Sequence, residues 1–182
     1  MGETNRTGFD LEMRILRAIS RPIAEMTVEQ ICKGAGISRQ TFYAHFKSKF
    51  DIVYWYISIA EETYLYEIGR TLTLEEGLDG FFEFLYRERG PLVNAFEKDP
   101  KKRELRHRLE KPCNEFMWTI LSKGVDVGDD LRFCIVYTVE SANCLVAGWC
   151  LNGMDEPPDV VSRRLAMCLP AQLVELAQLP NG

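Results

Sequence analysis

Two short helical segments joined by a glycine-containing turn constrain this fold more than any other feature of the sequence. Thr27 precedes Val28-Glu29-Gln30 with the spacing of a capping box, which predicts a helix that begins near residue 28. Gly34-Ala35-Gly36 interrupts that helix, and Ser38 is placed to cap a second one that runs to about His45. This arrangement is typical of a helix-turn-helix, whose second helix enters the major groove of DNA.

The remainder of the 182-residue chain has helical periodicity nearly throughout, so we expect an all-α protein. The expected domains are a three-helix helix-turn-helix domain over residues 1–48 and a C-terminal helical bundle over residues 49–182. Beyond the helix-turn-helix pair, the expected helices cover about 10–19, 48–69, 73–89, 91–96, 100–123, 129–152 and 157–179. Pro112 should kink one of them, and Pro170 should kink or interrupt the last.

Side chains that suit base recognition begin the second helix of the pair. Arg39 and Gln40 can pair with guanine and adenine edges, and Thr41 can meet a thymine methyl group or a phosphate. The amide-rich helix start at Ser38 favours a backbone phosphate. We expect Phe42 and Phe46 to be core residues. Lys33 and Lys47 are either solvated surface charges or phosphate contacts, and the sequence leaves both readings open.

The distribution of charge supports a polyanion-binding surface at the N-terminal end only. The whole chain has a net charge of −5. Residues 1–53 hold eight basic and six acidic residues, whereas the rest holds 14 basic and 21 acidic ones. A second basic run, between Lys98 and Lys111, is interleaved with acidic residues and is better explained as a solvated helix face than as a second nucleic-acid site.

Residues Thr27 to Lys49 resemble the TetR/AcrR family of bacterial transcriptional regulators. The resemblance lies in the Ala-Gly-Ile-Ser turn, the Thr-Phe-Tyr-x-His-Phe run and the final Lys-x-Lys. It implies phosphate contacts by Tyr43 and Lys49 and a position near the DNA backbone for His45. The candidate DNA contacts are therefore Thr27, Ser38, Arg39, Gln40, Thr41, Tyr43, His45, Lys47 and Lys49.

The resemblance also has departures and a possible finer branch. Arg21 to Met26 stands where the family usually has a glycine-aromatic pair, and Gln40 stands where many members have a small residue. The first departure implies a differently built corner after the first helix. The second implies a larger base-contacting side chain in the DNA groove. Arg39 to Tyr43 and Gly148 to Met154 together resemble a branch that includes regulators of dihydroxyacetone kinase operons.

The resemblance further implies a homodimer on palindromic operator DNA, most often a repressor, with a small-molecule pocket in the larger domain. Aromatic residues at helical spacing are individually best explained as core, but as a group they resemble the lining of an apolar pocket. The pocket candidates are Tyr64, Phe82, Tyr86, Phe116 and Tyr137. The last two long helices are apolar on two faces, which favours a partner. The dimer candidates are Ser141, Cys144, Leu145, Gly148, Trp149, Leu165, Cys168 and Leu169.

Other features narrow the class of protein. The six cysteines have no paired spacing and there are only two histidines, so we expect no metal and no cofactor. The N-terminus lacks the apolar stretch of a signal peptide, and the most apolar run, Cys144 to Leu151, is short, so we expect a cytoplasmic protein without a membrane span. We recognise no pairing of a nucleophile with a base in the sequence, so we do not expect an enzyme. The main alternative is a regulator-like protein that acts as an activator or through protein partners, without direct operator binding.

Overall fold

The computed structural model describes residues 3–96 and 110–179, with side chains from Thr7 onward. Over these ranges the chain folds into ten α-helices with no strand beyond an isolated bridge between Ile68 and Leu72, so the all-α prediction is confirmed. Residues 100–109 of the expected helix 100–123, and most of the basic run that begins at Lys98, lie outside the described residues.

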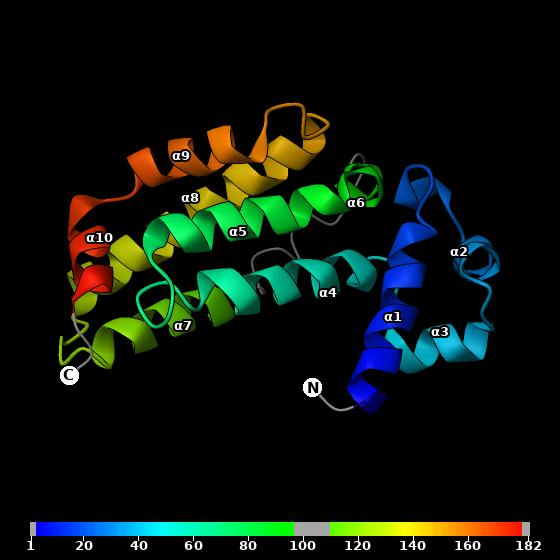
Figure 1. The fold of residues 1–182 in the computed structure, drawn as a ribbon, viewed down its shortest axis with the longest axis horizontal. Helices are drawn as coiled ribbons and strands as arrows, with labels where there is room; N and C mark the ends of the chain where they lie inside the picture. The colour runs from blue at the N-terminus through cyan, green and yellow to red at the C-terminus, as the bar shows by residue number, and fades with distance from the viewer. Residues whose placement is uncertain (1–2, 97–109, 180–182) are drawn as a thin grey trace.

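The N-terminal helices form a compact head at one end of an elongated molecule (Figure 1). This head consists of α1 (Glu3–Arg17), the 3₁₀ turn η1 (Ile23–Glu25), α2 (Val28–Ala35) and α3 (Arg39–His45). The first helix begins earlier than the expected residue 10 because its first turns are polar and lack the apolar periodicity that marks a core-facing helix.

The remaining helices form the body. They are α4 (Asp51–Ala60), the π-helical turn η2 (Glu61–Leu65), α5 (Leu74–Arg87), α6 (Arg89–Phe96), α7 (Glu110–Leu121), α8 (Asp129–Leu151), α9 (Pro158–Cys168) and α10 (Ala171–Gln178). Figure 1 shows α4 running from the head into the body. Pro170 separates α9 from α10, as expected from its missing amide hydrogen.

The connection between head and body differs from the sequence expectation in two ways. Ser48 is not the N-cap of α4; instead its amide N–H donates to the Asp51 carboxylate over 2.8 Å, and the helix begins at Asp51. The expected continuous helix to residue 69 also ends at Ala60, where a π-helical turn takes over. The bond between Ser48 and Asp51 thus precedes α4, and the π-helical turn follows it.

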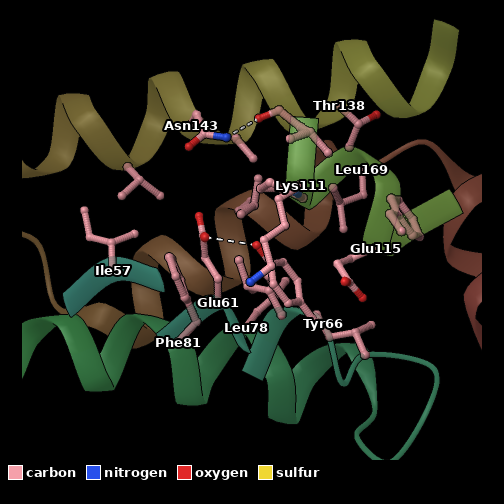
Figure 2. A pocket seen from close by; sticks show the side chains of 18 of the residues that line it. Ile57, Glu61, Tyr66, Leu78, Phe81, Lys111, Glu115, Thr138, Asn143 and Leu169 are labelled. Atoms are coloured by element: carbon pink, nitrogen blue, oxygen red, sulfur yellow. Dashed lines mark hydrogen bonds between the residues drawn. The ribbon is translucent and has the colours of Figure 1, made fainter. Parts of the chain in front are cut away.

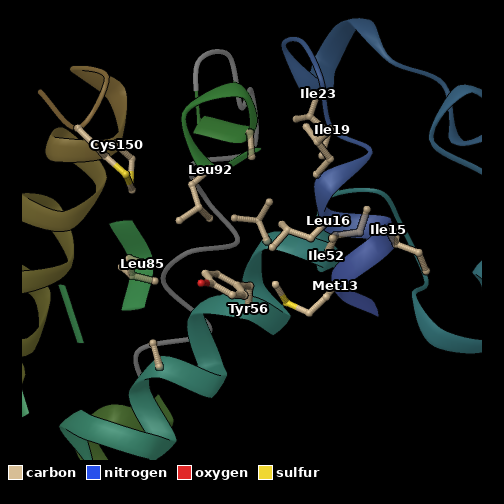
Figure 3. Packing of buried hydrophobic residues seen from close by; sticks show 14 of the residues in the cluster. Met13, Ile15, Leu16, Ile19, Ile23, Ile52, Tyr56, Leu85, Leu92 and Cys150 are labelled. Atoms are coloured by element: carbon tan, nitrogen blue, oxygen red, sulfur yellow. The ribbon is translucent and has the colours of Figure 1, made fainter. Parts of the chain in front are cut away.

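One continuous hydrophobic cluster joins head and body. Ile15 and Leu16 of α1 pack toward Ile52 and Tyr56 of α4, and the cluster continues through α5 and α6 to Cys150 of α8 (Figure 3). A smaller second cluster lies at the far end of the body, where α7, α8 and α10 meet; it contains Cys113, Met117, Ile120, Ile135 and Leu173. The head therefore has no separate core of its own.

The helix α8 is apolar on two sides. In the described ranges it alone has the length and mean hydropathy to cross a membrane, and only 22% of that apolar stretch is buried. The eight-residue apolar run considered in the sequence underestimated its extent. Its inner face buries Ile135, Val146 and Trp149, whereas its outer face leaves Phe133 73% exposed and Tyr137 63% exposed.

Candidate DNA interface and ligand cavity

Side-chain caps fix where α2 and α3 begin. The Thr27 N–H donates to Oε1 of Gln30 over 2.9 Å, and the Gln30 N–H donates to Oγ1 of Thr27 over 3.2 Å, which completes the expected capping box. At α3, the Thr41 N–H donates to Oγ of Ser38 over 3.0 Å. Arg21 adds a bond from Nη2 to Oε1 of Gln30 over 3.1 Å, so the unusual segment before Thr27 contacts the cap.

The turn between these helices requires its glycines. Gly36 has φ of 66° and ψ of 40°, a left-handed conformation that costs little only without a Cβ atom. At Gly34 a Cβ atom would lie 3.1 Å from Cβ of Ala18, because α2 packs closely on the end of α1. The Ile37 N–H then donates to the Cys32 carbonyl over 3.0 Å and closes the turn.

The second helix has one buried and one exposed face. Phe42 and Phe46 are buried and their ring centroids lie 5.9 Å apart, which confirms that they are core residues. On the opposite side Arg39 and Gln40 are exposed, and Tyr43 is 50% exposed. The first turn of α3 therefore presents two long polar side chains and its free amide groups to solvent, the geometry in which a recognition helix reads base edges.

Two candidate DNA contacts, Lys49 and His45, form hydrogen bonds within the protein. Nζ of Lys49 donates to the carbonyls of Met26 (2.6 Å) and Ala24 (3.2 Å), and partial burial lowers its pKa from the ordinary value. Nδ1 of His45 lies 3.0 Å from a carboxylate oxygen of Glu12 on α1. The ammonium group of Lys49 thus ties the start of α4 to η1 within the head, and its contact with a phosphate stays a prediction.

A cavity of about 370 Å³ lies in the body between α4, η2, α5, α7, α8, α9 and α10 (Figure 2). Its size falls within the range of pockets that enclose small molecules. Most of the lining is apolar and includes Ile57, Leu78, Phe81, Val146, Leu169 and Leu173. The polar lining residues include Glu61, which Figure 2 shows pointing into the space between α5 and α8, and Thr138 and Asn143 on α8.

The π-helical turn η2 sets the position of this carboxylate. The Tyr66 N–H donates to the Glu61 carbonyl over 2.9 Å, a bond between residues five apart. In an α-helix such residues would point about 140° away from one another. In η2 they share a face, and the Tyr66 hydroxyl donates to Oε2 of Glu61 over 3.1 Å. Burial and the adjacent Glu61 raise the pKa of Tyr66 above its ordinary value, so the hydroxyl stays protonated as a donor.

Two ion pairs surround the polar end of the cavity. Arg70 donates to Oγ1 of Thr119 and to the side chain of Glu115, both over 2.9 Å, and so fastens the segment after η2 to α7. Nζ of Lys111 lies 2.5 Å from Oε1 of Glu62 and 5.5 Å above the Tyr66 ring. The hydrogen bond to Glu62 raises the pKa of Lys111, so this lysine stays charged and paired.

The pocket residues expected from the sequence divide between lining and core. Phe116 lines the cavity. The other four lie elsewhere: Phe82 is buried against Trp149, Tyr86 stacks on Trp149, and Tyr64 packs against Phe84. Tyr137 points outward from α8. Aromatic character alone did not distinguish core residues from cavity-lining residues, because both kinds of residue occur at the same helical spacing.

The dimer candidates also divide. Ser141, Cys144 and Cys168 are exposed, and Gly148 and Leu145 are partly so. Trp149 and Leu165 are buried inside the protomer and Leu169 lines the cavity, which corrects their assignment to an interface. Outward apolar side chains of α8 and α9 that the sequence did not select include Phe133, Val136 and Met167.

Polar contacts join the head to the body beside the shared core. Nε and Nη2 of Arg17 in α1 donate to Oε1 of Glu88 over 2.9 and 2.5 Å. Nδ2 of Asn94 in α6 donates to the Ile19 carbonyl over 3.3 Å. These bonds place the corner between α5 and α6 directly against the end of α1.

Metal and thiol chemistry have little support in the described part of the chain. Within residues 3–96 and 110–179, no three His, Cys, Asp or Glu side chains gather closely enough to hold a metal. Cys32, Cys113 and Cys150 are buried, whereas Cys144 and Cys168 are exposed on α8 and α9. Burial raises the pKa of the Cys150 thiol to about 12, which makes it unreactive.

The fold and the α2–α3 geometry together define a helix-turn-helix protein with an all-α body. Residues 18–53 match the model for bacterial regulatory proteins of the tetR family. Residues 18–53 are thus similar to the DNA-binding part of the tetR family, in agreement with the sequence resemblance, and the chain as a whole has the fold of a TetR-family regulator.

Individual relatives cover different parts of the chain. The HTH-type transcriptional regulator EthR of Mycobacterium tuberculosis and of Mycobacterium bovis is 46% identical over 48 residues, which are 24% of this chain and 22% of EthR. The match thus spans about a fifth of the length of these relatives. A crystal structure of a tetR-family transcriptional regulator from Streptomyces coelicolor aligns over 98% of this chain and 89% of that chain, with a TM-score of 0.54 and 16% identity. This second likeness concerns the fold alone.

Proposed function

We propose that the protein is a homodimeric transcriptional regulator that binds palindromic operator DNA in the bacterial cytoplasm through α3. The observation that carries this proposal is the exposed first turn of α3, where Arg39 and Gln40 extend from a helix whose other face is locked into the core. Arg39 and Gln40 read bases, and Thr41, Tyr43, Lys47 and the helix start at Ser38 contact phosphates. Thr27 offers the corresponding helix start at α2, and His45 lies at the edge of this surface.

The test uses the operator that genomic footprinting with the purified protein identifies. Arg39→Ala or Gln40→Ala should weaken binding to that site by about 1–3 kcal/mol and relax base preference at one position of each half-site. Lys47→Ala should weaken all sequences alike and reduce the salt slope by about 0.9. Arg87→Ala, an exposed change on α5, away from the head and from the outer face of α8 and α9, is the control. A protein that enriches no DNA would favour the alternative, action through protein partners.

We infer that a second copy of the chain covers the outer face of α8 and α9. Phe133, Tyr137, Ser141 and Cys144 lie on one stripe of α8, because their spacing returns to the same side of a helix. Exposed large apolar side chains gathered in this way are typical of an interface, and a twofold interface pairs one patch with itself. Such a dimer presents two copies of α3 to two halves of a palindrome.

Sedimentation tests the dimer. Cys144→Arg places a charge on the exposed stripe without disturbing the protomer core, so it should produce folded monomers with little affinity for the palindromic site. Glu83→Arg changes an exposed residue on α5 and serves as the control. A wild-type protein that sediments as a monomer at micromolar concentration would contradict the dimer, and an unchanged Cys144→Arg dimer would place the interface elsewhere.

The cavity supports a response to a small molecule. A ligand changes DNA affinity only if it binds the DNA-competent and DNA-incompetent arrangements with different affinity. Because α4 borders the cavity and also packs against α1, occupancy can alter the position of the head. We propose that ligand binding releases the protein from its operator, which would make it a repressor.

A further inference from the structure

The corner between α5 and α6 is a single residue long and lies against the head. Helix α5 ends at Arg87 and α6 begins at Arg89, so Glu88 alone connects them. The Glu88 carboxylate accepts two bonds from Arg17 at the end of α1. Figure 1 shows this corner at the end of the body nearest the head, where the chain also turns from α8 into α9.

The second residue of this corner, Arg89, contacts the turn between α8 and α9. It donates from Nε to the Gly153 carbonyl over 2.7 Å and from Nη2 to the Asp155 carboxylate over 2.6 Å. Its guanidinium group also lies 5.7 Å from the ring centroid of Tyr86, which stacks on Trp149 of α8. Adjacent residues of one corner thus hold the head on one side and the α8–α9 turn on the other.

The turn that Arg89 contacts has an unusual backbone. Gly153 has φ of 76° and Met154 has φ of 50°, so two successive residues are left-handed, and only the first lacks a Cβ atom. The Met154 side chain is buried, and Arg89 binds the carbonyl of the peptide that joins the two residues. This bond therefore helps to fix the direction in which α9 leaves α8.

The polar contacts of the corner add direction to a contact between head and body that is otherwise apolar. Around the corner, the shared hydrophobic cluster includes Ile19, Leu85, Leu92 and Cys150 (Figure 3). Apolar attraction is non-directional, so it holds the two regions together without selecting one angle between them. Hydrogen bonds need short distances and nearly straight angles, so the bonds of Glu88 and Arg89 restrict that angle.

The angle of the head matters for a dimer that binds two half-sites. Each base pair added between the half-sites moves one of them by about 3.4 Å along the DNA and by about 35° around it. Heads held at one angle to α8 and α9, the helices of the proposed interface, match one such arrangement. Heads that rotate on the body match several.

We propose that Glu88 and Arg89 are positioning residues that fix each head relative to α8 and α9 and thereby determine the half-site spacing that the dimer accepts. This inference rests on the proposed homodimer and its palindromic operator. Glu88 acts through its bonds to α1, and Arg89 acts through its bonds to the α8–α9 turn. Neither residue needs to touch DNA for this role.

The experiment measures binding to palindromes that differ only in spacing. The half-sites that footprinting identifies are placed at their native spacing or with one or two base pairs added or removed, and an isolated half-site is included. The wild type should bind the native spacing most tightly. Arg89→Met removes the donors but keeps a long side chain, so it should reduce this preference by about three- to tenfold, because each dimer loses the contact twice. Affinity for the isolated half-site should not change.

Two further variants locate the effect. Glu88→Gln weakens the contact with α1 and should reduce the preference by about two- to fivefold. Arg87→Met is the matched control, because that exposed arginine ends α5 just before the corner; it should keep the preference of the wild type. Sedimentation should show that all three variants remain dimers. If Arg89→Met does not fold, Glu88→Gln decides.

The outcomes that contradict the proposal are distinct. A wild-type preference in Arg89→Met or in Glu88→Gln would contradict the role of that residue. An equal loss of affinity at every spacing and on the isolated half-site would show damage to the head itself, and would overturn the proposal.

The wild type separates this inference from the proposed function. A monomer, or a protein that binds no palindrome, would contradict the proposed function and this inference with it. A wild-type dimer that binds its palindrome equally well at every spacing would contradict this inference alone. The same holds for a dimer that selects one spacing while both corner variants keep that selection.

Discussion

The DNA interface of the head and the cavity of the body differ in how far apart in the sequence their residues lie. All candidate DNA contacts fall between Thr27 and Lys49, whereas the cavity lining runs from Tyr54 to Ala177 and comes from helices at both ends of the body. Local bonds, such as the two caps of α2 and α3, fix the interface. The cavity has no comparable local determinant, and its shape depends on how the whole body packs. A surface made by neighbours in sequence can thus stay constant while a distributed site changes.

The contrast does not extend to stability, because both regions share one hydrophobic cluster. Phe42→Ala should lower the free energy of unfolding by about 3–5 kcal/mol, since this ring is fully buried. The unfolding transition should shift by the same amount at Trp55, which contacts Phe46 near the head, and at Trp149, which contacts Phe82 in the body. Urea unfolding followed by fluorescence, in single-tryptophan variants, measures both.

Lys47→Ala is the control for this change and should alter stability by less than about 0.5 kcal/mol, because the side chain is exposed. A transition at Trp149 that stays in place while the transition at Trp55 shifts would show that head and body unfold separately.

Two glycines sharpen the comparison within the body. Gly69 has φ of 75°, and a Cβ atom there would lie 2.4 Å from the Ala177 carbonyl oxygen of α10. Gly69→Ala should therefore cost about 1–3 kcal/mol and weaken ligand binding, because Ala177 lines the cavity. Gly90→Ala on α6 meets nothing within 4 Å and should stabilise by about 0.4–1 kcal/mol. Thermal unfolding of the pair measures both, and shifts of the same sign would contradict the docking of α10 on Gly69.

Two lysines at the end of the interface allow a role in stability to be distinguished from a role in DNA contact. Lys49→Met removes the donor to the Ala24 and Met26 carbonyls and should lower the free energy of unfolding by about 1–2 kcal/mol. Lys47→Met should leave unfolding unchanged and instead reduce the salt dependence of DNA binding. Chemical denaturation and DNA titration on the same samples test this division. The opposite pattern would support Lys49 as a phosphate contact.

The smallest expected effect concerns the ion pair between head and body. Glu88 is largely buried but Arg17 is 61% exposed, so Arg17→Ala should cost only about 0.2–1 kcal/mol. A double-mutant cycle with Glu88→Gln isolates the pair. Binding of cavity ligands should stay the same, because neither residue lines the cavity. A change in ligand affinity in Arg17→Ala would show that this ion pair couples ligand binding in the body to the head.

The sequence predicted the head in detail because its signals are short-range. The capping box at Thr27, the cap at Ser38 and the buried face of Phe42 and Phe46 are all confirmed. The contacts of Lys49 within the head were not predicted, for a tertiary reason: the carbonyls of Ala24 and Met26, more than twenty residues earlier, accept from its ammonium group. No pattern around Lys49 itself could have indicated this contact.

The body was predicted only as a set of helices. Trp149 and Leu165 were expected at an interface and are buried, since periodicity identifies an apolar face but not the neighbour it meets. Glu61 was missed because a single carboxylate on an amphipathic helix resembles a solvated residue. The signal that could have found it is weak: after Thr63, the acidic pair Glu61-Glu62 is followed by Tyr64, Leu65 and Tyr66, and an uninterrupted α-helix would direct Tyr66 away from Glu61.

The π-helical turn at Glu61 to Leu65 has a consequence for how the length of this chain can change. The turn contains one residue more than an α-helical turn needs, so deletion of a single residue there can be absorbed without breaking the helix. The deletion would leave Tyr66 four residues after Glu61, and because four residues of an α-helix turn through about 400°, the two side chains would stay on one face. A relative that differs only by such a one-residue gap would therefore keep this pair of side chains together, along with the head and the helical body.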